Sequence, residues 1–286
     1  MLSTISISNS RIAELLQYAV QQLHNSDTAR LDAEVLLCHT ANIDRSTLYA
    51  HPEQVVDEDA INSYRSIIEA RKKGQPVAYL TNTKEFWSME FMVNEHTLIP
   101  RPDTECLMTT TLNYLPKDKP LTIADLGTGC GIVAICIARE RPQCHVVATD
   151  ISSQSIQVAR QNADLHLINN ISFIKSNWFE NINDRFHMVV SNPPYIKEND
   201  EHLKTGDVKH EPLLALTSGE DGLDAIRHII NNAPNYLHPG GCLLLEHGFD
   251  QGEKVRRLLH KQGFVDTNTF KDYGGNDRVS IGIFFN

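Results

Sequence analysis

The order of strands and helices in the last two thirds of the chain is the feature that most limits its fold. From residue 121 onward, short apolar runs alternate with longer segments of helical periodicity. The runs that we predict as strands are residues 121–127, 145–150, 171–176, 187–191, 242–248 and 278–285. The predicted helices between them are residues 131–140, 152–166, 221–237 and 253–263. Strands joined through helices of this length pair in parallel, so the pattern predicts an α/β fold whose ligands bind beyond the carboxyl ends of the strands.

The N-terminal quarter of the chain has helical periodicity only. Apolar residues recur at three- and four-residue spacing over residues 12–23 and 31–37, and a third long helix is expected over residues 60–71. Asp27 is the expected N-cap of the second helix. We predict a helical bundle over residues 1–75, and because it carries no cluster of polar residues, it suits a partner-recognition module or a lid.

A change of period follows the bundle. Residues 76–102 bring apolar residues close together around polar ones, which predicts a β-hairpin linker. Asp103 is the expected N-cap of the next helix, which opens a domain over residues 103–286.

The composition argues against several classes of protein. The 286 residues carry a net charge of −10, so the surface as a whole repels phosphate backbones and we expect no direct binding of nucleic acid. No apolar run reaches the roughly 18 residues that span a bilayer. The first ten residues lack the parts of a signal peptide, so we expect a cytoplasmic protein without a membrane partner. The six cysteines include no CxxC pair and the thirteen histidines no HExxH pattern, so no metal site is expected.

A glycine-rich loop and an acidic residue follow the first two predicted strands. Glycines at positions 127, 129 and 131 let the backbone turn tightly and approach a ligand beside the amides of the next helix. Such loops also serve packing alone, and the spacing departs from the GxGxxG fingerprint. Asp150 stands nineteen residues after Gly131, where doubly wound proteins place an acid on ribose hydroxyls. Together they favour a nucleoside site, with capping of the next helix as the alternative role of Asp150.

Polar and aromatic residues also follow the third and fourth strands. Asn177 and Trp178 stand where an indole can lie beside an adenine, although a tryptophan there, taken alone, more often belongs to the core. The sequence NPPY then ends the fourth strand, and its two prolines stop the strand in a rigid, extended shape. The side-chain oxygen of Asn192 and the carbonyl of Pro193 could both face the cleft beside the Tyr195 ring, with room for a planar NH2 group. Alone, NPPY would predict a strand-ending turn, but four successive strand ends of this kind favour a site.

These motifs resemble a known class of enzyme. DLGTGCG, Asp150, SNWFE and NPPY look like the motifs of class I S-adenosylmethionine-dependent methyltransferases that methylate amino groups. With EFWS, LIPRPDTE, HEPLLAL and EHGFDQG, nearly the whole chain resembles the release factor glutamine methyltransferase family. A sibling family methylates a glutamine of a ribosomal protein and differs after its IPR segment. The sequence PDTE at residues 102–105 favours the release factor family.

The resemblance implies a fold and a reaction. The fold is a Rossmann-like seven-stranded methyltransferase sheet, mostly parallel with one antiparallel strand among the last, preceded by the helical bundle for substrate-protein recognition and the β-hairpin linker. The reaction is methylation of the side-chain amide of the glutamine in the Gly-Gly-Gln loop of peptide-chain release factors, with S-adenosylmethionine as donor and S-adenosylhomocysteine as product. The alternatives are a glutamine methyltransferase for a ribosomal protein and a nucleic-acid exocyclic-amine methyltransferase. We expect a monomer.

The resemblance also assigns residues to the site. The expected cofactor contacts are Gly127, Thr128, Gly129, Cys130, Gly131, Asp150, Trp178 and Asn192. The expected substrate contacts are Asn192, Pro193, Pro194 and Tyr195, and the expected catalytic residues are Asn192, Pro193 and Tyr195. Two positions depart from the family: Cys130 stands where serine is frequent, and Asn177 replaces a frequent aspartate and so loses a charge. No role is assigned to Phe86, Trp87, Arg101, Glu105 or Glu211.

Overall fold

The computed structural model describes residues 10–285, and these divide into two compact units. The smaller unit contains the residues up to Asn82 together with Lys204–His210, and the larger unit contains Thr83–Leu203 and the residues from Glu211 onward. Residues 1–9, which include most of the segment compared with a signal peptide, and Asn286 lie outside the described residues. Within residues 10–285, no helix combines the length and the apolar character needed to cross a membrane.

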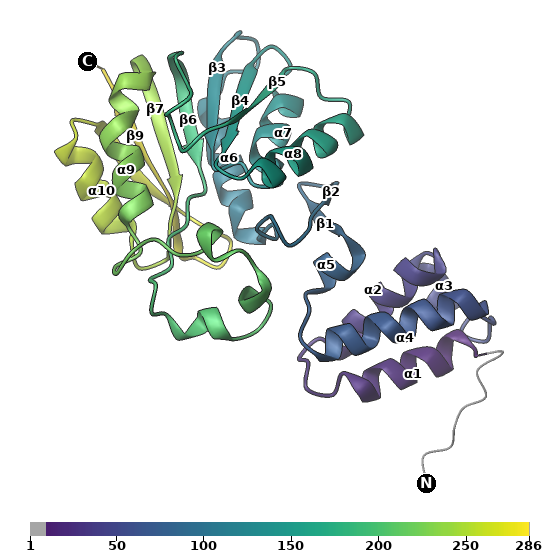
Figure 1. The fold of residues 1–286 in the computed structure, drawn as a ribbon. Coiled ribbons are helices and arrows are strands. Elements are labelled where there is room, and N and C mark those ends of the chain that lie inside the picture. The colour runs from purple at the N-terminus through teal and green to yellow at the C-terminus, as the bar shows by residue number, and fades with distance from the viewer. Residues whose placement is uncertain (1–9, 286) are drawn as a thin grey trace. The chain divides into compact units, whose positions relative to one another are not determined.

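Helices build the smaller unit, as the sequence predicts (Figure 1). They are α1 (Ile12–Gln22), α2 (Ala29–Ala41), α3 (Arg45–Ala50), α4 (Glu58–Lys72) and α5 (Val77–Thr81). Their apolar faces share one core, in which the buried Tyr64 donates a hydrogen bond of 3.0 Å to the carbonyl of Ala33. The prediction for Asp27 is wrong, because α2 begins after Thr28. Residues 77–81 are helical where the sequence predicts the start of the hairpin linker, since Val77 and Leu80 pack on the core of the bundle.

A segment from far along the chain also belongs to the smaller unit. Lys204–His210 contains the end of η2 (Glu201–Lys204) and the turn η3 (Val208–His210). Arg71 of α4 donates from Nε to Asp32 at 2.8 Å and from Nη1 to Asp207 at 2.8 Å. This pairing of one guanidinium with two carboxylates joins α2, α4 and the later segment.

A β-hairpin opens the larger unit. Strands β1 (Thr83–Phe86) and β2 (Met89–Met92) pair antiparallel, which confirms the predicted hairpin. Trp87 and Ser88 form its two-residue turn with φ of +53° and +55°, the left-handed conformation that matches the twist of a hairpin. Asn162 of α8 (Ser153–Leu165) accepts from the amide of Met92 at 2.7 Å and donates to its carbonyl at 2.9 Å, so the hairpin is fixed to that helix.

The seven-stranded sheet forms the centre of the larger unit and confirms the predicted fold class. Its strands are β3 (Thr122–Leu126), β4 (His145–Asp150), β5 (Ile171–Lys175), β6 (Phe186–Ser191), β7 (Leu237–Glu246), β8 (Val265–Lys271) and β9 (Asp277–Phe284). The spatial order is β5-β4-β3-β6-β7-β9-β8, and β9 alone runs opposite to the other six strands of this sheet. From β3 the chain continues to β4 and β5 on one side, whereas β6 and β7 lie on the other side of β3. The strand order therefore reverses between β3 and β6, and ligands bind at such a switch point in doubly wound sheets.

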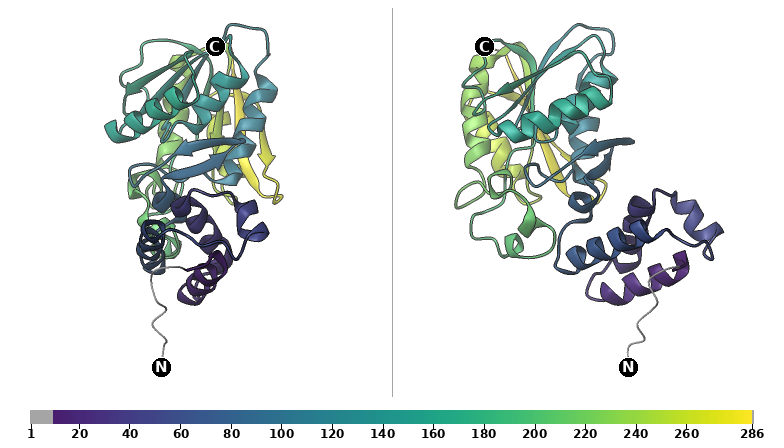
Figure 2. Two further views of the ribbon diagram at one scale, coloured as in Figure 1. Left: turned by 90° about the vertical axis from the view of Figure 1, so that its right-hand side faces the viewer. Right: turned by 45° about the vertical axis from the view of Figure 1, so that its right-hand side comes forward.

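Helices cover both faces of this sheet. They are α6 (Glu105–Tyr114), α7 (Ile132–Glu140), α8, α9 (Asp224–Asn232) and α10 (Gly252–Lys261). Helices α9 and α10 share one core with residues such as Leu126 and Leu245, and in Figures 1 and 2 they lie on the side of the sheet opposite α7 and α8. Because side chains alternate along a strand, Asp125 and Glu246 face the side that carries α6 and α7.

Three local predictions differ from the structure. The sequence gives one helix over residues 221–237, but α9 stops at Asn232 and a 3-10 turn, η5 (Ala233–Tyr236), follows because Pro234 cannot continue the ladder. Strand β8 has no counterpart among the predicted strands, because its sequence VDTNTFK is polar and lies at an exposed edge. Asp103 does not cap α6, since it lies within η1 (Pro102–Thr104) and pairs with Arg278 at 3.0 Å.

Candidate active site

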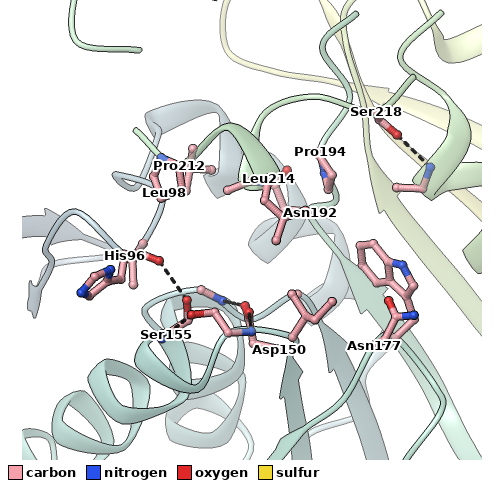
Figure 3. A pocket seen from close by; sticks show the side chains of 18 of the residues that line it. His96, Leu98, Asp150, Ser155, Asn177, Asn192, Pro194, Pro212, Leu214 and Ser218 are labelled. Carbon is pink, nitrogen blue, oxygen red and sulfur yellow. Dashed lines mark hydrogen bonds between the residues drawn. The ribbon is translucent and has the colours of Figure 1, made fainter. Parts of the chain in front are cut away.

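A cavity of about 620 Å³ lies at the carboxyl ends of the parallel strands. Seven of the residues singled out in the sequence line it: Gly127, Gly129, Asp150, Asn177, Trp178, Asn192 and Pro194. Figure 3 shows Asn192, Pro194 and Leu214 on one side of the cavity, with Asp150, Ser155 and Asn177 on the opposite side. The four strand ends that the sequence brings forward therefore meet at one cavity.

The three glycines of GTGCG have different local roles. All three have positive φ, +72° at Gly127, +57° at Gly129 and +90° at Gly131. A side chain at Gly129 would meet no atom within 4 Å, so the backbone there is open to the cavity. A Cβ at Gly127 would lie 3.4 Å from the ring of Trp178, and one at Gly131 would lie 2.9 Å from Ile135. Two glycines therefore border the cavity, whereas Gly131 allows close packing of α7 and lines no part of it.

A smaller cavity adjoins the same loop. It is lined by Thr128, Cys130, Thr104 and Asn192, together with Gly127 and Gly129. The Thr128 hydroxyl donates to the buried Asp125 at 2.7 Å. Burial raises the pKa of the Cys130 thiol to about 12, so this cysteine is a neutral lining group at physiological pH.

Asp150 fixes the loop that carries these glycines. Its Oδ2 accepts from the amide of Gly129 at 2.9 Å, and its Oδ1 accepts from the amide of Ser152 at 2.8 Å. The cap of α8 is Ser152, whose hydroxyl accepts from the amide of Ser155 at 3.1 Å. Burial raises the pKa of Asp150, although both amide hydrogen bonds oppose the shift. Asp150 thus leaves the helix cap to Ser152 and presents a carboxylate to the cavity wall.

Trp178 and Asn177 form the wall next to the loop. Trp178 has φ of +52°, an uncommon conformation for a bulky residue, and its side chain packs on the core below α9 as well as beside Gly127. The Asn177 amide nitrogen donates to Glu180 at 2.6 Å. The wall thus offers an aromatic surface next to an amide.

The four residues of NPPY separate into two groups. Asn192 and Pro194 line the cavity, and the Asn192 amide nitrogen donates to the Thr104 hydroxyl at 3.2 Å, which leaves its side-chain oxygen as the acceptor. The Pro193 ring is buried and Tyr195 lies off the cavity wall, with its hydroxyl donating to Glu246 at 3.3 Å. The structure therefore brings Asn192 and Pro194 to the cavity, but not the Tyr195 ring.

Two segments that the sequence leaves without a role form the rim. Glu95, His96, Thr97 and Leu98 line the cavity, as do Pro212, Leu214 and Ala215. The buried carboxylate of Glu211 joins the two segments, because it accepts from the amide of Ile99 at 3.0 Å and pairs with Arg101. These residues belong to the motifs LIPRP and HEPLL of the sequence. Neither motif, taken alone, indicates that the two segments contact each other.

The other residues without an assigned role lie off the cavity wall. Phe86 is buried in the hairpin, the Trp87 indole donates to Glu140 at 3.3 Å, and Glu105 opens α6. Within residues 10–285, no three His, Cys, Asp or Glu side chains are placed to hold a metal ion.

Comparison with known proteins identifies the family. The chain is 45% identical over 270 residues to the release factor glutamine methyltransferase of Salmonella typhimurium, covering 94% of this chain and 97% of that protein. It is 43% identical over 271 residues to that of Escherichia coli, covering 94% and 98%. The chain belongs to the release factor glutamine methyltransferase family.

Domain and fold comparisons agree with this membership. Residues 14–81 match the family described as PrmC N-terminal domain, and residues 104–208 match the methyltransferase small domain. A methyltransferase from Pyrococcus furiosus has the same fold, with a TM-score of 0.54 at 18% identity over 78% of this chain and 98% of that one. The resemblance drawn from DLGTGCG, NPPY and the flanking motifs is thus confirmed, and the larger unit is a methyltransferase domain.

Proposed function

We propose that this protein transfers a methyl group from S-adenosylmethionine to the side-chain amide of the glutamine in the Gly-Gly-Gln loop of peptide-chain release factors. The observation that carries the proposal is the side-chain oxygen of Asn192, held toward a cavity that also contains a glycine loop and a strand-end carboxylate. It occurs in a chain with 43–45% identity to proteins that bear this function in their names.

The residues around the cavity fit the proposed donor. The open backbone at Gly129 admits a ligand against the loop, and Asp150 offers carboxylate oxygens to the hydroxyls of a ribose. Trp178 and Asn177 suit the flat surface and the exocyclic amine of an adenine. We propose that these residues hold the nucleoside, with Thr128 and Cys130 beside them and Gly131 supporting the loop.

The acceptor side fits a planar amide. The nitrogen of a glutamine side chain is a weak nucleophile because its lone pair is delocalised into the carbonyl. In our proposal Asn192 accepts one N–H through its side-chain oxygen, and the carbonyl of Pro193 accepts the other. Two such bonds favour a pyramidal nitrogen and aim its lone pair, while Pro194 lines the approach. Tyr195 then acts from behind the wall, where its hydroxyl bonds Glu246.

Orientation supplies most of the rate in this proposal. S-adenosylmethionine supplies an electrophilic methyl group carried on a sulfonium. The protein's part is to hold nitrogen, methyl carbon and sulfur in line, and such alignment is worth roughly 7 kcal/mol or more in well-oriented reactions. No general base is required, because the methylated amide is strongly acidic and loses its proton to water.

The smaller unit is the proposed site of partner recognition. Its helices carry none of the residues that line the cavity, and the protein substrate is larger than the cavity can hold. We propose that it binds the body of the release factor, that the protein acts as a monomer, and that it works in the cytoplasm with its substrate.

Methyl transfer to purified release factor tests the function. We expect labelled S-adenosylmethionine to label one glutamine, and Asn192→Ala to reduce the rate by about 100-fold or more while thermal unfolding stays unchanged. A release factor with that glutamine replaced by glutamate is the control for position. DNA, rRNA and ribosomal protein serve as competing substrates, and faster transfer to any of them would overturn the assignment.

A further inference from the structure

Two buried side chains lie behind Asn192, and the reaction described above does not use them. Glu246, at the end of β7, is fully buried, and Thr104, in η1, is 1% exposed. We propose that Glu246 is a positioning residue, which fixes the direction of a hydrogen-bond chain through Thr104 so that Asn192 presents an oxygen to the substrate amide. This inference rests on the proposed function.

Two hydrogen bonds and one close approach connect these side chains within the larger unit. The Asn192 amide nitrogen donates to the Thr104 hydroxyl at 3.2 Å. The Thr104 side chain lies near the Glu246 carboxylate, where a hydrogen bond from its hydroxyl lowers the pKa of that carboxyl. The Tyr195 hydroxyl donates to Oε1 of the same carboxylate at 3.3 Å. Both residues of NPPY that carry polar side chains are thus connected to Glu246.

The chemistry of these groups gives the chain a direction. A hydroxyl that accepts a hydrogen bond from Asn192 must donate its own proton elsewhere, and an ionised carboxylate can only accept. With Glu246 ionised, Thr104 donates to it and remains an acceptor for the Asn192 nitrogen. The side-chain oxygen of Asn192 is then the atom left to face the cavity. If Glu246 becomes a donor, Thr104 can donate toward Asn192, and the amide can turn its nitrogen to the substrate.

A purely structural role is a poor explanation for an acid here. Oε2 of Glu246 has no hydrogen-bond partner among residues 10–285, although the atom is buried. A buried carboxylate with unused acceptor capacity is costly, and an apolar residue of similar size would stabilise the fold better. The acid stands at the end of β7, near both Thr104 and Tyr195.

The charge of this group is sensitive to pH in the physiological range. Burial raises the pKa of Glu246 to about 7, against the effects of Thr104, Arg278 and Tyr195. Arg278 is held by Asp272 and Asp103 at 3.0 Å each, and Asp103 itself adds to the rise in pKa. Burial raises the pKa of the Cys106 thiol in α6, and the charge of Glu246 adds to that rise. These titratable and charged groups face Glu246 from the segment after β6 and from β9, η1 and α6.

The test uses the full chain, purified release factor and the isosteric change Glu246→Gln. We expect kcat to fall by about 10- to 100-fold with little change in cofactor Kd, because an amide can donate as well as accept and no longer fixes Thr104. The wild-type kcat should rise as pH passes through about 7, and this rise should be lost in Glu246→Gln. Glu253→Gln, on the exposed face of α10, is the control for removal of a charge.

A double-mutant cycle decides whether the residues act as one chain. Thr104→Val removes the hydroxyl at nearly constant volume. It should lower kcat and remove the pH dependence, as Glu246→Gln does. The double variant should have a kcat no lower than that of the slower single variant. It also carries the test if Glu246→Gln fails to fold. Additive losses, or a Glu246→Gln enzyme that keeps its rate or its pH dependence, would overturn the inference. If the wild type turns over no release factor, the proposed function has failed instead, and the inference with it.

Discussion

The two sides of the cavity differ in the sequence distance between the parts that build them. On the side that we propose for the nucleoside, here called the nucleoside side and formed by the GTGCG loop, Asp150 and Trp178, the bond from Gly129 to Asp150 spans 21 residues. On the acceptor side, formed by Asn192, Thr104 and the rim, the bond from Asn192 to Thr104 spans 88 residues and that from Ile99 to Glu211 spans 112. The nucleoside side is therefore assembled by adjacent βα units, whereas the acceptor side requires the completed fold.

The largest expected effect concerns the long-range contacts of the rim. Glu211→Ala removes a buried carboxylate and leaves the amide of Ile99 and the guanidinium of Arg101 without it. Since removing one partner of a buried pair costs about 3 kcal/mol or more, chemical denaturation should show a loss of this size. The control Glu253→Ala breaks an exposed pair with Arg257 and should cost about 0.5 kcal/mol or less. An equal loss of unfolding free energy in the two variants would show that the Glu211 contacts stabilise the protein no more than an exposed ion pair does.

A smaller effect separates two glycines within the nucleoside side. Gly131→Ala forces a Cβ to within 2.9 Å of Ile135 and 3.1 Å of Ala159 at a φ of +90°. It should lower the free energy of unfolding by about 2–3 kcal/mol through strain and overpacking. Gly129→Ala meets open space at a φ of +57° and should lose only about 1 kcal/mol. Cofactor affinity, measured by calorimetry, should instead fall more in Gly129→Ala, and the reverse order would contradict the roles given to these glycines.

The smallest expected effect concerns the charge of Asp150. Asp150→Asn keeps one acceptor oxygen for the amide of Gly129, but its NH2 group then faces the amide of Ser152, so the free energy of unfolding should fall by about 1 kcal/mol. The change also replaces the charged acceptor that we propose for the ribose by a neutral one. We expect about a tenfold weaker affinity for S-adenosylmethionine, equivalent to about 1.4 kcal/mol. Titration calorimetry measures this directly. An unchanged affinity would mean that Asp150 serves the loop alone.

The same difference in sequence distance explains what could be predicted. The strand ends at Asp150, Trp178 and Asn192 were predicted to meet, because parallel strands with helical crossovers place their carboxyl ends at one edge. The acceptor role of Asn192 is also predicted from the sequence and stays a proposal. The orientation of the Asn192 side chain could not be predicted from the sequence, because the Thr104 hydroxyl that accepts from its nitrogen belongs to η1, 88 residues earlier in the chain.

Other failures of prediction have the same physical origin. Strand β8 pairs at the edge of the sheet beside β9, so its polar sequence never shows the apolar run that marks β3 or β6. Tyr195 follows two prolines that give no information on side-chain direction, and its partner Glu246 is fixed by strand pairing fifty-one residues later. Glu246 itself lies in an apolar run, CLLLE, where local pattern gives no reason for an acid.

The return of Lys204–His210 to the smaller unit has a consequence for how such a protein can be divided. The chain passes between the units three times, after residues 82, 203 and 210. A gene fragment ending at residue 82 would encode the helices but omit Asp207, one of the two carboxylates that pair with Arg71. The smaller unit is therefore not encoded by one continuous stretch of sequence. Recombination that exchanges it between relatives would preserve it only if the segment after NPPY were exchanged with it.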